Sequence, residues 1–216
     1  SYDKLGRQIG KVDDATAANS QFRTHQWVYD TKVNGVGKIA SASGFDTTGV
    51  AYSEDYEYLS FGLLDKVDST IDGRTYSVVH TYDNFSRARA VTYPTGFVLI
   101  TNYNNNGHVN ELTDITQTEK FWQAQTDDAI GNVIQYSYGN NDSITKAYDY
   151  KNGLIDTIVA TNGAFTIQNH DYNFDNEGNL RKRENIAQSI IQNFCYDELN
   201  RLTHSTISGT CSDVSG

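Results

Sequence analysis

Short runs of alternating apolar and polar residues recur along the chain, and clusters of Gly, Asn, Asp and Ser separate them. A period of two is typical of β-strands, because successive side chains of a strand point to opposite faces of a sheet. Sequential strands joined by short turns pair antiparallel, so the middle of the chain is predicted to be a β-meander. Residues 184–194 are also compatible with a helical turn. The clearest series predicts strands at residues 76–82, 87–93, 97–103 and 108–112.

One phrase recurs between the strands: an aromatic residue, Asp, two variable residues, Gly, a polar residue and an aliphatic residue. Most copies follow one another at intervals of about 21–27 residues, which marks a repeat protein. A further, weaker copy has Leu59 at the Asp place. The residues that carry the phrase are Tyr2, Asp3, Gly6; Tyr29, Asp30; Phe45, Asp46; Tyr82, Asp83; Tyr103, Gly107; Asp128, Gly131; Tyr148, Asp149; Phe174, Asp175, Gly178; and Tyr196, Asp197, Asn200.

Each place in the phrase has a role in turn formation. An Asp or Asn that opens a tight turn accepts hydrogen bonds from backbone N–H groups two residues further on. The Gly place requires a positive φ, which Gly adopts without steric cost and Asn tolerates, as at Asn200. Ser86 departs from this rule, so the turn at Asp83 is expected to be of another type. Two copies are stretched: the one at Asp30 reaches a glycine late, and the one at Asp149 reaches Gly153 one residue late.

The composition fits β-hairpins and narrows the possible partners. Among the 216 residues, 12% are aromatic and 15 are Tyr, which argues against a disordered chain. The net charge of −10 makes nucleic acid an unfavourable partner. No run of about 18 apolar residues occurs, so no membrane span is expected. The chain contains no Met and opens within a copy of the phrase, so we expect residues 1–216 to be a single repeat segment of a longer protein.

The two cysteines, Cys195 and Cys211, allow two interpretations. They are either two buried free thiols or a local disulfide that closes one hairpin and its return loop. In a secreted protein such a bridge would stabilise the fold by roughly 3 kcal/mol. Neither cysteine belongs to a CxxC pair or has a His at ligand spacing, so a zinc site is not expected.

The phrase, together with YPTGF at residues 93–97 and FCYDELNRL at residues 194–202, resembles the RHS/YD-repeat family over essentially the whole chain. The family includes bacterial polymorphic toxins, toxin-complex cocoon proteins and teneurins. The resemblance implies an all-β fold in which tandem antiparallel hairpins form a curved, spiralling sheet, part of a shell or barrel. Nothing in the chain matches the family's self-cutting segment, since the only proline is Pro94 after Tyr93. Only the wall is therefore expected here.

The implied function is structural and non-catalytic: an extracellular or cell-surface wall, bacterial in origin, that encloses or displays a toxin or effector. Its expected partners are the flanking repeats and an enclosed toxin domain or glycans. A cell-surface adhesin or carbohydrate-binding module is the alternative. Since a wound sheet has unpaired edges, the isolated segment is also expected to associate edge to edge.

The repetition of the Asp places argues for turn formation rather than catalysis, because a catalytic group is needed once and a turn in every hairpin. The histidines show no partner at fixed spacing, and neither a nucleophile elbow nor an HExxH motif accompanies them. No catalytic residue is predicted. The histidines are His25, His80, His108, His170 and His204.

Two ligand hypotheses remain as alternatives to purely structural roles. Asp171, Asn173, Asp175 and Glu177 alternate oxygen ligands as in a calcium loop, but the glycine of this segment does not fall where an EF-hand turn needs it. No cofactor or metal is therefore expected, with calcium as the alternative. Aromatic residues such as Trp27 and Trp122 are expected to pack in cross-strand ladders, with sugar stacking as the alternative.

Overall fold

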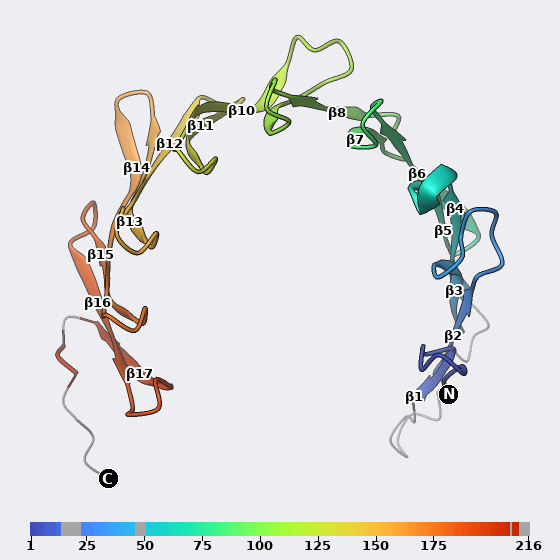
Figure 1. Ribbon diagram of the computed structural model, residues 1–216, viewed down its shortest axis with the longest axis horizontal. Coiled ribbons are helices and arrows are strands. Elements are labelled where there is room, and N and C mark those ends of the chain that lie inside the picture. The colour runs from blue at the N-terminus through green and yellow to red at the C-terminus, as the bar shows by residue number, and fades with distance from the viewer. Residues whose placement is uncertain (14–22, 46–50, 208, 212–216) are drawn as a thin grey trace. The chain divides into compact units, whose positions relative to one another are not determined.

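The computed structural model describes residues 1–13, 23–45, 51–207 and 209–211. The chain divides into two compact units, residues 1–101 and 102–216. Strands make up nearly all of the secondary structure in both units (Figure 1). The described residues also contain one short 3-10 turn, η1 (Ser60–Gly62), and no helix among them is long and apolar enough to cross a membrane.

The first unit is an antiparallel meander in which each strand pairs with the next along the chain. The last two residues of its final strand belong to the second unit. Its strands are β1 (Gly10–Asp13), β2 (Arg23–Tyr29), β3 (Ile39–Phe45), β4 (Ala51–Tyr58), β5 (Leu64–Ile71), β6 (Arg74–Tyr82), β7 (Ala88–Thr92) and β8 (Val98–Tyr103).

The second unit repeats this plan, again with each strand antiparallel to the next. Its strands are β9 (Val109–Thr113), β10 (Lys120–Asp127), β11 (Val133–Tyr138), β12 (Asp142–Tyr148), β13 (Ile155–Asn162), β14 (Phe165–Phe174), β15 (Leu180–Asn185), β16 (Ile190–Tyr196) and β17 (Leu202–Ile207). The predicted all-β fold of tandem antiparallel hairpins is therefore confirmed.

The four strands predicted from alternation correspond to β6, β7, β8 and β9. The alternative of a helical turn within residues 184–194 is wrong, because this segment holds the end of β15, a turn and most of β16. The turn is closed by the amide of Gln188, which donates to the carbonyl oxygen of Asn185 at 3.3 Å. Ser189 has a φ of 54°, and this left-handed residue reverses the chain into a strand.

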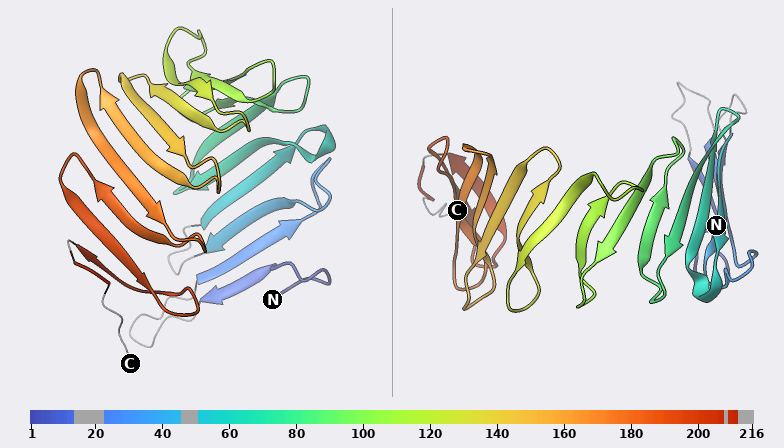
Figure 2. Two further views of the ribbon diagram at one scale, coloured as in Figure 1. Left: turned by 60° about the vertical axis from the view of Figure 1, so that its left-hand side comes forward. Right: turned by 90° about the horizontal axis from the view of Figure 1, so that it is seen from above.

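Each unit is a single layer of strands among its described residues (Figure 2). One layer cannot cover its own apolar side chains, because domains normally bury them between two packed layers. The buried apolar set is accordingly small: Ala40, Ala42, Ala90, Ile100, Ile144 and Cys195. Most other apolar residues of the strands stay partly exposed.

Candidate functional site

The recurrent structural feature is a five-residue turn that begins at the Asp of the phrase. In the turn at residues 83–87, the amide of Asp83 donates to the carbonyl oxygen of Arg87 at 2.9 Å, and the amide of Ser86 donates to the carbonyl oxygen of Asp83 at 2.9 Å. Oδ1 of Asp83 accepts the amides of Phe85 and Arg87 at 2.9 and 3.0 Å. Oδ2 accepts Nε of Arg87 at 2.7 Å. One carboxylate thus satisfies two backbone donors and one side chain.

The same two backbone bonds and the same two amide-to-carboxylate bonds recur in three other turns that begin at a phrase Asp. They recur again in the turn at Asp197. The fourth residue always has a positive φ, as the phrase requires. These first and fourth residues are Asp3 with Gly6, Asp128 with Gly131, Asp175 with Gly178, and Asp197 with Asn200. Asn104 makes the equivalent bonds with its side-chain oxygen, and Gly107 is its fourth residue.

The structure corrects the expectation for Ser86. This residue has a φ of 61° and its turn has the same hydrogen bonds as the glycine-containing copies. The turn is therefore not of another type; Ser adopts the left-handed conformation at a steric cost that Gly avoids.

Two turns keep the backbone bonds with neither Asp nor Asn at the first position. The amide of Tyr93 donates to the carbonyl oxygen of Phe97 at 2.8 Å, and the amide of Leu59 donates to that of Leu63 at the same distance. Both have glycine at the fourth position, Gly96 and Gly62. The backbone reversal therefore depends on the left-handed residue, and the carboxylate is an addition to it.

The two stretched copies form longer loops. The amide of Asp30 donates to the carbonyl oxygen of Lys38 at 3.0 Å, and Oδ1 of Asp30 accepts the amide of Gly37 at 2.6 Å. Asp149 closes its loop on Leu154, one residue later than in the five-residue turns. The copy at Phe45 and Asp46 involves residues 46–50, which lie outside the described part of the chain.

One related turn, which begins at Asp114 and closes on Glu119, one residue later than the five-residue turns, escaped the sequence search. Asp114 accepts the amides of Thr116, Thr118 and Glu119, and Gln117 takes the left-handed position with a φ of 59°. The segment has neither an aromatic residue before the Asp nor a glycine. Its only sequence signal is an Asp followed by Ile115 and then by four polar residues between two strands.

The aromatic residue before the first position of the turn joins neighbouring hairpins in two of the copies. The hydroxyl of Tyr58 donates to the carbonyl oxygen of Ile39 at 2.7 Å, and that of Tyr82 donates to Leu64 at 2.7 Å. In each case the acceptor is the first residue of the strand that follows the preceding turn. Burial raises the pKa of Tyr58 and of Tyr82, so both hydroxyls remain donors at neutral pH.

The fifth residue of the turn contacts the next turn of the same kind. Nη1 and Nη2 of Arg7 donate to the two carboxylate oxygens of Asp30 at 3.1 and 2.5 Å. Asn179 donates to Oδ1 of Asn200 at 3.0 Å. The His108 ring packs against Gly131, where an added Cβ would lie 3.0 Å from its Cε1. These contacts align successive repeats along one edge of the sheet within each unit.

The hydrogen bonds lower the pKa of several turn carboxyls. The amide of Arg7 and then its side chain lower the pKa of Asp3, and Arg201 acts in the same way on Asp197. At Asp83, partial desolvation by itself would raise the pKa, but the bonds from Arg87 and Phe85 outweigh it and the net pKa is lowered. These carboxylates are thus stabilised as anions, which suits acceptors rather than general acids.

In five of the eight described five-residue turns, the third residue has a large apolar side chain that is exposed to solvent. Their exposed fractions lie between 72% and 95%, although nothing in the turn geometry requires an apolar residue there. These side chains therefore add apolar surface to the turns themselves. We call them the apolar tips; they are Leu5, Phe61, Phe85, Ile130 and Leu199.

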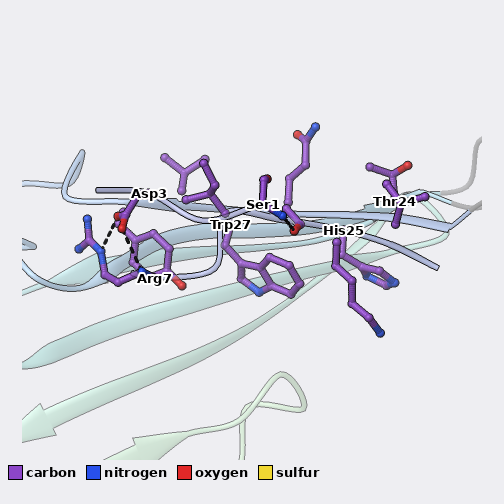
Figure 3. Close-up of a pocket in the computed structure, with 13 residues that line it drawn as sticks. Ser1, Asp3, Arg7, Thr24, His25 and Trp27 are labelled. Carbon is purple, nitrogen blue, oxygen red and sulfur yellow. Dashed lines mark hydrogen bonds and ion pairs between the residues drawn. The ribbon is translucent and has the colours of Figure 1, made fainter. Parts of the chain in front are cut away.

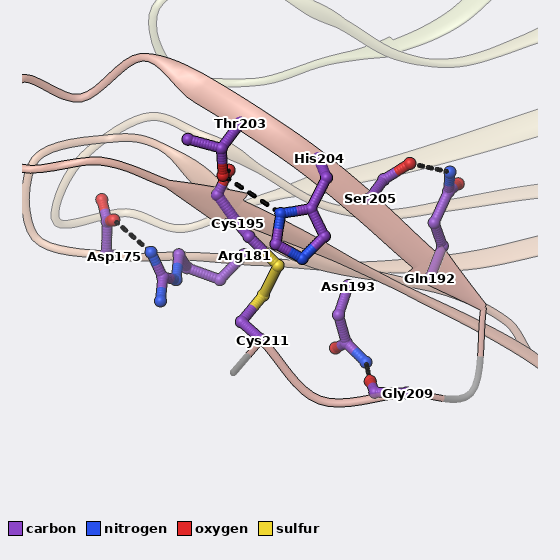
Figure 4. The surroundings of a disulfide bond; sticks show 10 residues. All are labelled: Asp175, Arg181, Gln192, Asn193, Cys195, Thr203, His204, Ser205, Gly209 and Cys211. Atoms are coloured by element: carbon purple, nitrogen blue, oxygen red, sulfur yellow. Dashed lines mark hydrogen bonds and ion pairs between the residues drawn. A yellow bond between two sulfur atoms is a disulfide. The ribbon is translucent and has the colours of Figure 1, made fainter. Parts of the chain in front are cut away.

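Cys195 and Cys211 form a disulfide, as one of the two sequence interpretations predicted (Figure 4). Cys195 is buried on β16, and the bond holds the segment after β17 against that strand. Asn193 of the same strand donates to the carbonyl oxygen of Gly209. His204 lies opposite Cys195 in the β16–β17 register.

The histidines and the calcium-like segment do not converge on one site. His25 lies beside Trp27, whereas His170 contacts Gln168 and Tyr172 through its Nδ1. His80 and His204 lie on different strands, β6 and β17. The Asp175 carboxylate accepts amides of its own turn, and Asp171 lies opposite Glu184 on β15. In the part of the chain that the structure describes, no group of three or more His, Cys, Asp or Glu could hold a metal ion.

The two tryptophans lie in different surroundings. Trp27, half-buried on β2, lines a pocket of about 650 Å³ together with Asp3, Arg7 and His25 (Figure 3). Trp122, on β10, packs against Tyr136 of β11 with ring centroids 5.9 Å apart.

Comparison with known proteins identifies the fold. No protein-family model and no curated protein matches the chain. A crystal structure of TcdB2-TccC3-TEV has a TM-score of 0.64 and 15% identity over 94% of this chain, and one of TcdB2-TccC3-Cdc42 has the same values over 92%. The Tc holotoxin pore of Photorhabdus luminescens, with a mutation in TccC3, has a TM-score of 0.62 and 16% identity over 93%.

The matched region is 12% of each of these toxin chains, so the present chain spans a small part of their length. The shared feature is the antiparallel sheet itself. The chain therefore has the fold of the RHS-repeat sheet of Tc toxin proteins, which is the fold that the resemblance of its repeated phrase implied.

Proposed function

We propose that this chain is a non-catalytic wall segment of a larger RHS-type shell, which encloses or displays a toxin or effector domain. The observation that carries the proposal is the fold match over 94% of the chain to a TcdB2-TccC3 toxin structure. The single layer of strands supports it, because one layer needs further protein on its faces. The repeated Asp-turns also support it, since their carboxylates are engaged by their own backbone amides.

The exposed apolar tips fit the same role. A free-standing domain that left five such residues in solvent would risk aggregation, whereas a wall segment has neighbours that cover them. We propose that the flanking repeats of the same protein are the first of these neighbours. Edge-to-edge association of the isolated segment stays a prediction, which sedimentation at several concentrations tests: a single monomeric species at all concentrations would contradict it.

The location proposed is the outside of a bacterium, either secreted or at the cell surface. The Cys195–Cys211 disulfide supports this, because such bonds persist in oxidising compartments and are rare in the cytosol. Alkylation of free thiols followed by mass spectrometry on protein from the culture medium should find both cysteines unmodified. Complete alkylation before reduction would contradict an oxidising location.

Electron cryomicroscopy of the full-length parent protein tests the wall function. We expect the β-strands of this segment to continue into neighbouring repeats, and one face of the sheet to border an internal volume that contains another domain. A parent in which both faces of this sheet contact bulk solvent would overturn the proposal. A turnover activity that is lost on substituting one His or Asp of this segment would overturn its non-catalytic part.

A further inference from the structure

We propose that the Cys195–Cys211 disulfide is a redox-controlled clasp, and that attack by a thiol on Cys211 releases residues 209–211 from the sheet. We call these three residues the strap; they are Gly209, Thr210 and Cys211. The proposal is independent of the wall function, because it concerns only the strap and the two strands beneath it, β16 and β17. Opening of the disulfide would make the attachment of the strap depend on the redox state of the surroundings.

The strap doubles back over one face of β16 and β17. β17 ends opposite Gln192 of β16, whereas Cys211 is bonded to Cys195, near the other end of β16 (Figure 4). The chain therefore returns from the end of β17 towards its beginning. A Cβ at Gly209 would collide with Oγ1 of Thr206, so the backbone of the strap lies directly on this side chain of β17.

The polar contacts beneath the strap oppose one another. The side-chain amide of Asn193 donates to the carbonyl oxygen of Gly209. Oγ1 of Thr206, in contrast, is buried and has no hydrogen-bond partner among the described residues. A buried hydroxyl without a partner costs free energy, and it regains a hydrogen bond to water when the strap lifts. Because the gain at Asn193 is offset by the cost at Thr206, the disulfide decides whether the strap stays closed.

The two cysteines differ in exposure. Cys195 is only 4% exposed, whereas Cys211 is half-buried and follows the exposed Thr210. In thiol–disulfide exchange the attacking thiolate must reach one of the two sulfur atoms, so the rate depends on which of them is accessible. Exposure therefore selects Cys211 as the attacked residue and Cys195 as the leaving group.

Two exchange steps complete the reaction with a dithiol. A thiolate of the dithiol bonds to Sγ of Cys211 and breaks the S–S bond, and Cys195 leaves as a thiolate that takes up a proton from water. The second thiolate of the dithiol attacks the first sulfur of the dithiol and displaces Cys211, which is protonated in the same way. The protein disulfide gains two electrons and two protons, and the dithiol is oxidised to a cyclic disulfide. In an oxidising compartment this reductant is lacking, so the clasp stays closed.

Nuclear magnetic resonance relaxation of the chain, before and after complete reduction by dithiothreitol, tests the clasp. We expect the backbone order parameters of residues 209–211 to fall from about 0.8 to below about 0.6, the range of flexible segments, while those of β15 and β16 stay unchanged. Reoxidation should restore the high values, and Cys211→Ser should show the low values without reductant. A strap that stays ordered after complete reduction would overturn the proposal, and so would a loss of order throughout β15 and β16.

Peptide mapping identifies the attacked sulfur. Brief treatment of the folded chain with reduced glutathione, followed by an acid quench and mass spectrometry, should find the mixed disulfide on Cys211 about fivefold more often than on Cys195, or more. A mixed disulfide mainly on Cys195, or a bond that glutathione opens only in denaturant, would contradict the proposed reaction.

A variant of Thr206 tests the role of the buried hydroxyl. Thr206→Val keeps the shape of the side chain and removes the hydroxyl, so in the reduced chain it should raise the ratio of closed to open strap about fivefold or more. The amide chemical shifts of residues 209–211 report this ratio. Ser205→Ala is the control, because Ser205 lies on the opposite face of β17, and it should leave the ratio unchanged. An equal ratio in Thr206→Val and the wild type would overturn the proposed balance.

Discussion

The two turns that flank β7 have the same backbone hydrogen bonds and differ in their side chains. The turn before β7 begins at Asp83 and has Ser86 at its left-handed position; the turn after it begins at Tyr93 and has Gly96 there. The first has a carboxylate that compensates a strained residue, and the second has an unstrained glycine and no carboxylate. The comparison indicates that a left-handed fourth residue reverses the chain in both turns, and that the carboxylate adds hydrogen bonds where this residue is not glycine.

Replacing the glycine should give the largest effect, because the Tyr93 turn has no carboxylate to compensate. We expect Gly96→Val to lower the free energy of unfolding by about 1–2 kcal/mol or more, since a left-handed φ of 83° is costly for a β-branched residue. Urea unfolding measures the loss. Thr81→Val is the control. It replaces one β-branched residue by another at an exposed position within β6, so it should have little effect. Equal losses in both variants would show that the turn geometry is not the cause.

Removing the carboxylate should give the next largest effect, and only in the first turn. Asp83→Ala deprives the amides of Phe85 and Arg87 of their acceptor, while Asp83→Asn keeps the Oδ1 acceptor, as Asn104 does in its own turn, and loses only the ion pair with Arg87. Unfolding experiments should rank the stabilities as wild type, then Asn, then Ala. If Asp83→Ala were as stable as Asp83→Asn, the hydrogen bonds from the backbone amides of Phe85 and Arg87 would contribute nothing to the free energy of unfolding.

Most of these turns were predictable from the sequence. The residue at the first position provides the hydrogen-bond acceptor, and the residue at the fourth position is the one with a positive φ. The turn at Asp114 was missed because Gln117 is an unusual residue for a positive φ. The pairing of Arg7 with Asp30 was also beyond the sequence, because it depends on how turns 23 residues apart are aligned across the sheet. The same limit applies to Trp27 and Trp122, whose surroundings are set by residues of neighbouring strands.

The pH dependence of stability should distinguish the two turns more finely. The pKa of Asp83 is lowered in the folded chain, so its ionised form contributes stability above the unfolded pKa of about 3.9, and this contribution is lost as the pH falls through the lower folded value. The difference in unfolding free energy between the wild type and Asp83→Asn should therefore be constant from neutral pH down to about pH 5 and shrink below about pH 4. A difference that does not change between neutral pH and pH 3 would contradict the assigned role of the carboxylate.

The smallest expected effect is a gain from Ser86→Gly. Glycine removes the steric cost of a φ of 61° but adds flexibility to the unfolded chain, so the two contributions partly cancel and leave a gain of about 0.5 kcal/mol or less. The gain should persist in the Asp83→Ala background, because a turn with glycine and no carboxylate would then match the one at Tyr93. If Ser86→Gly instead destabilises the chain in both backgrounds, the Ser86 side chain contributes a contact of its own. Glycine at the fourth position would then not be equivalent in the Asp83 turn and the Tyr93 turn.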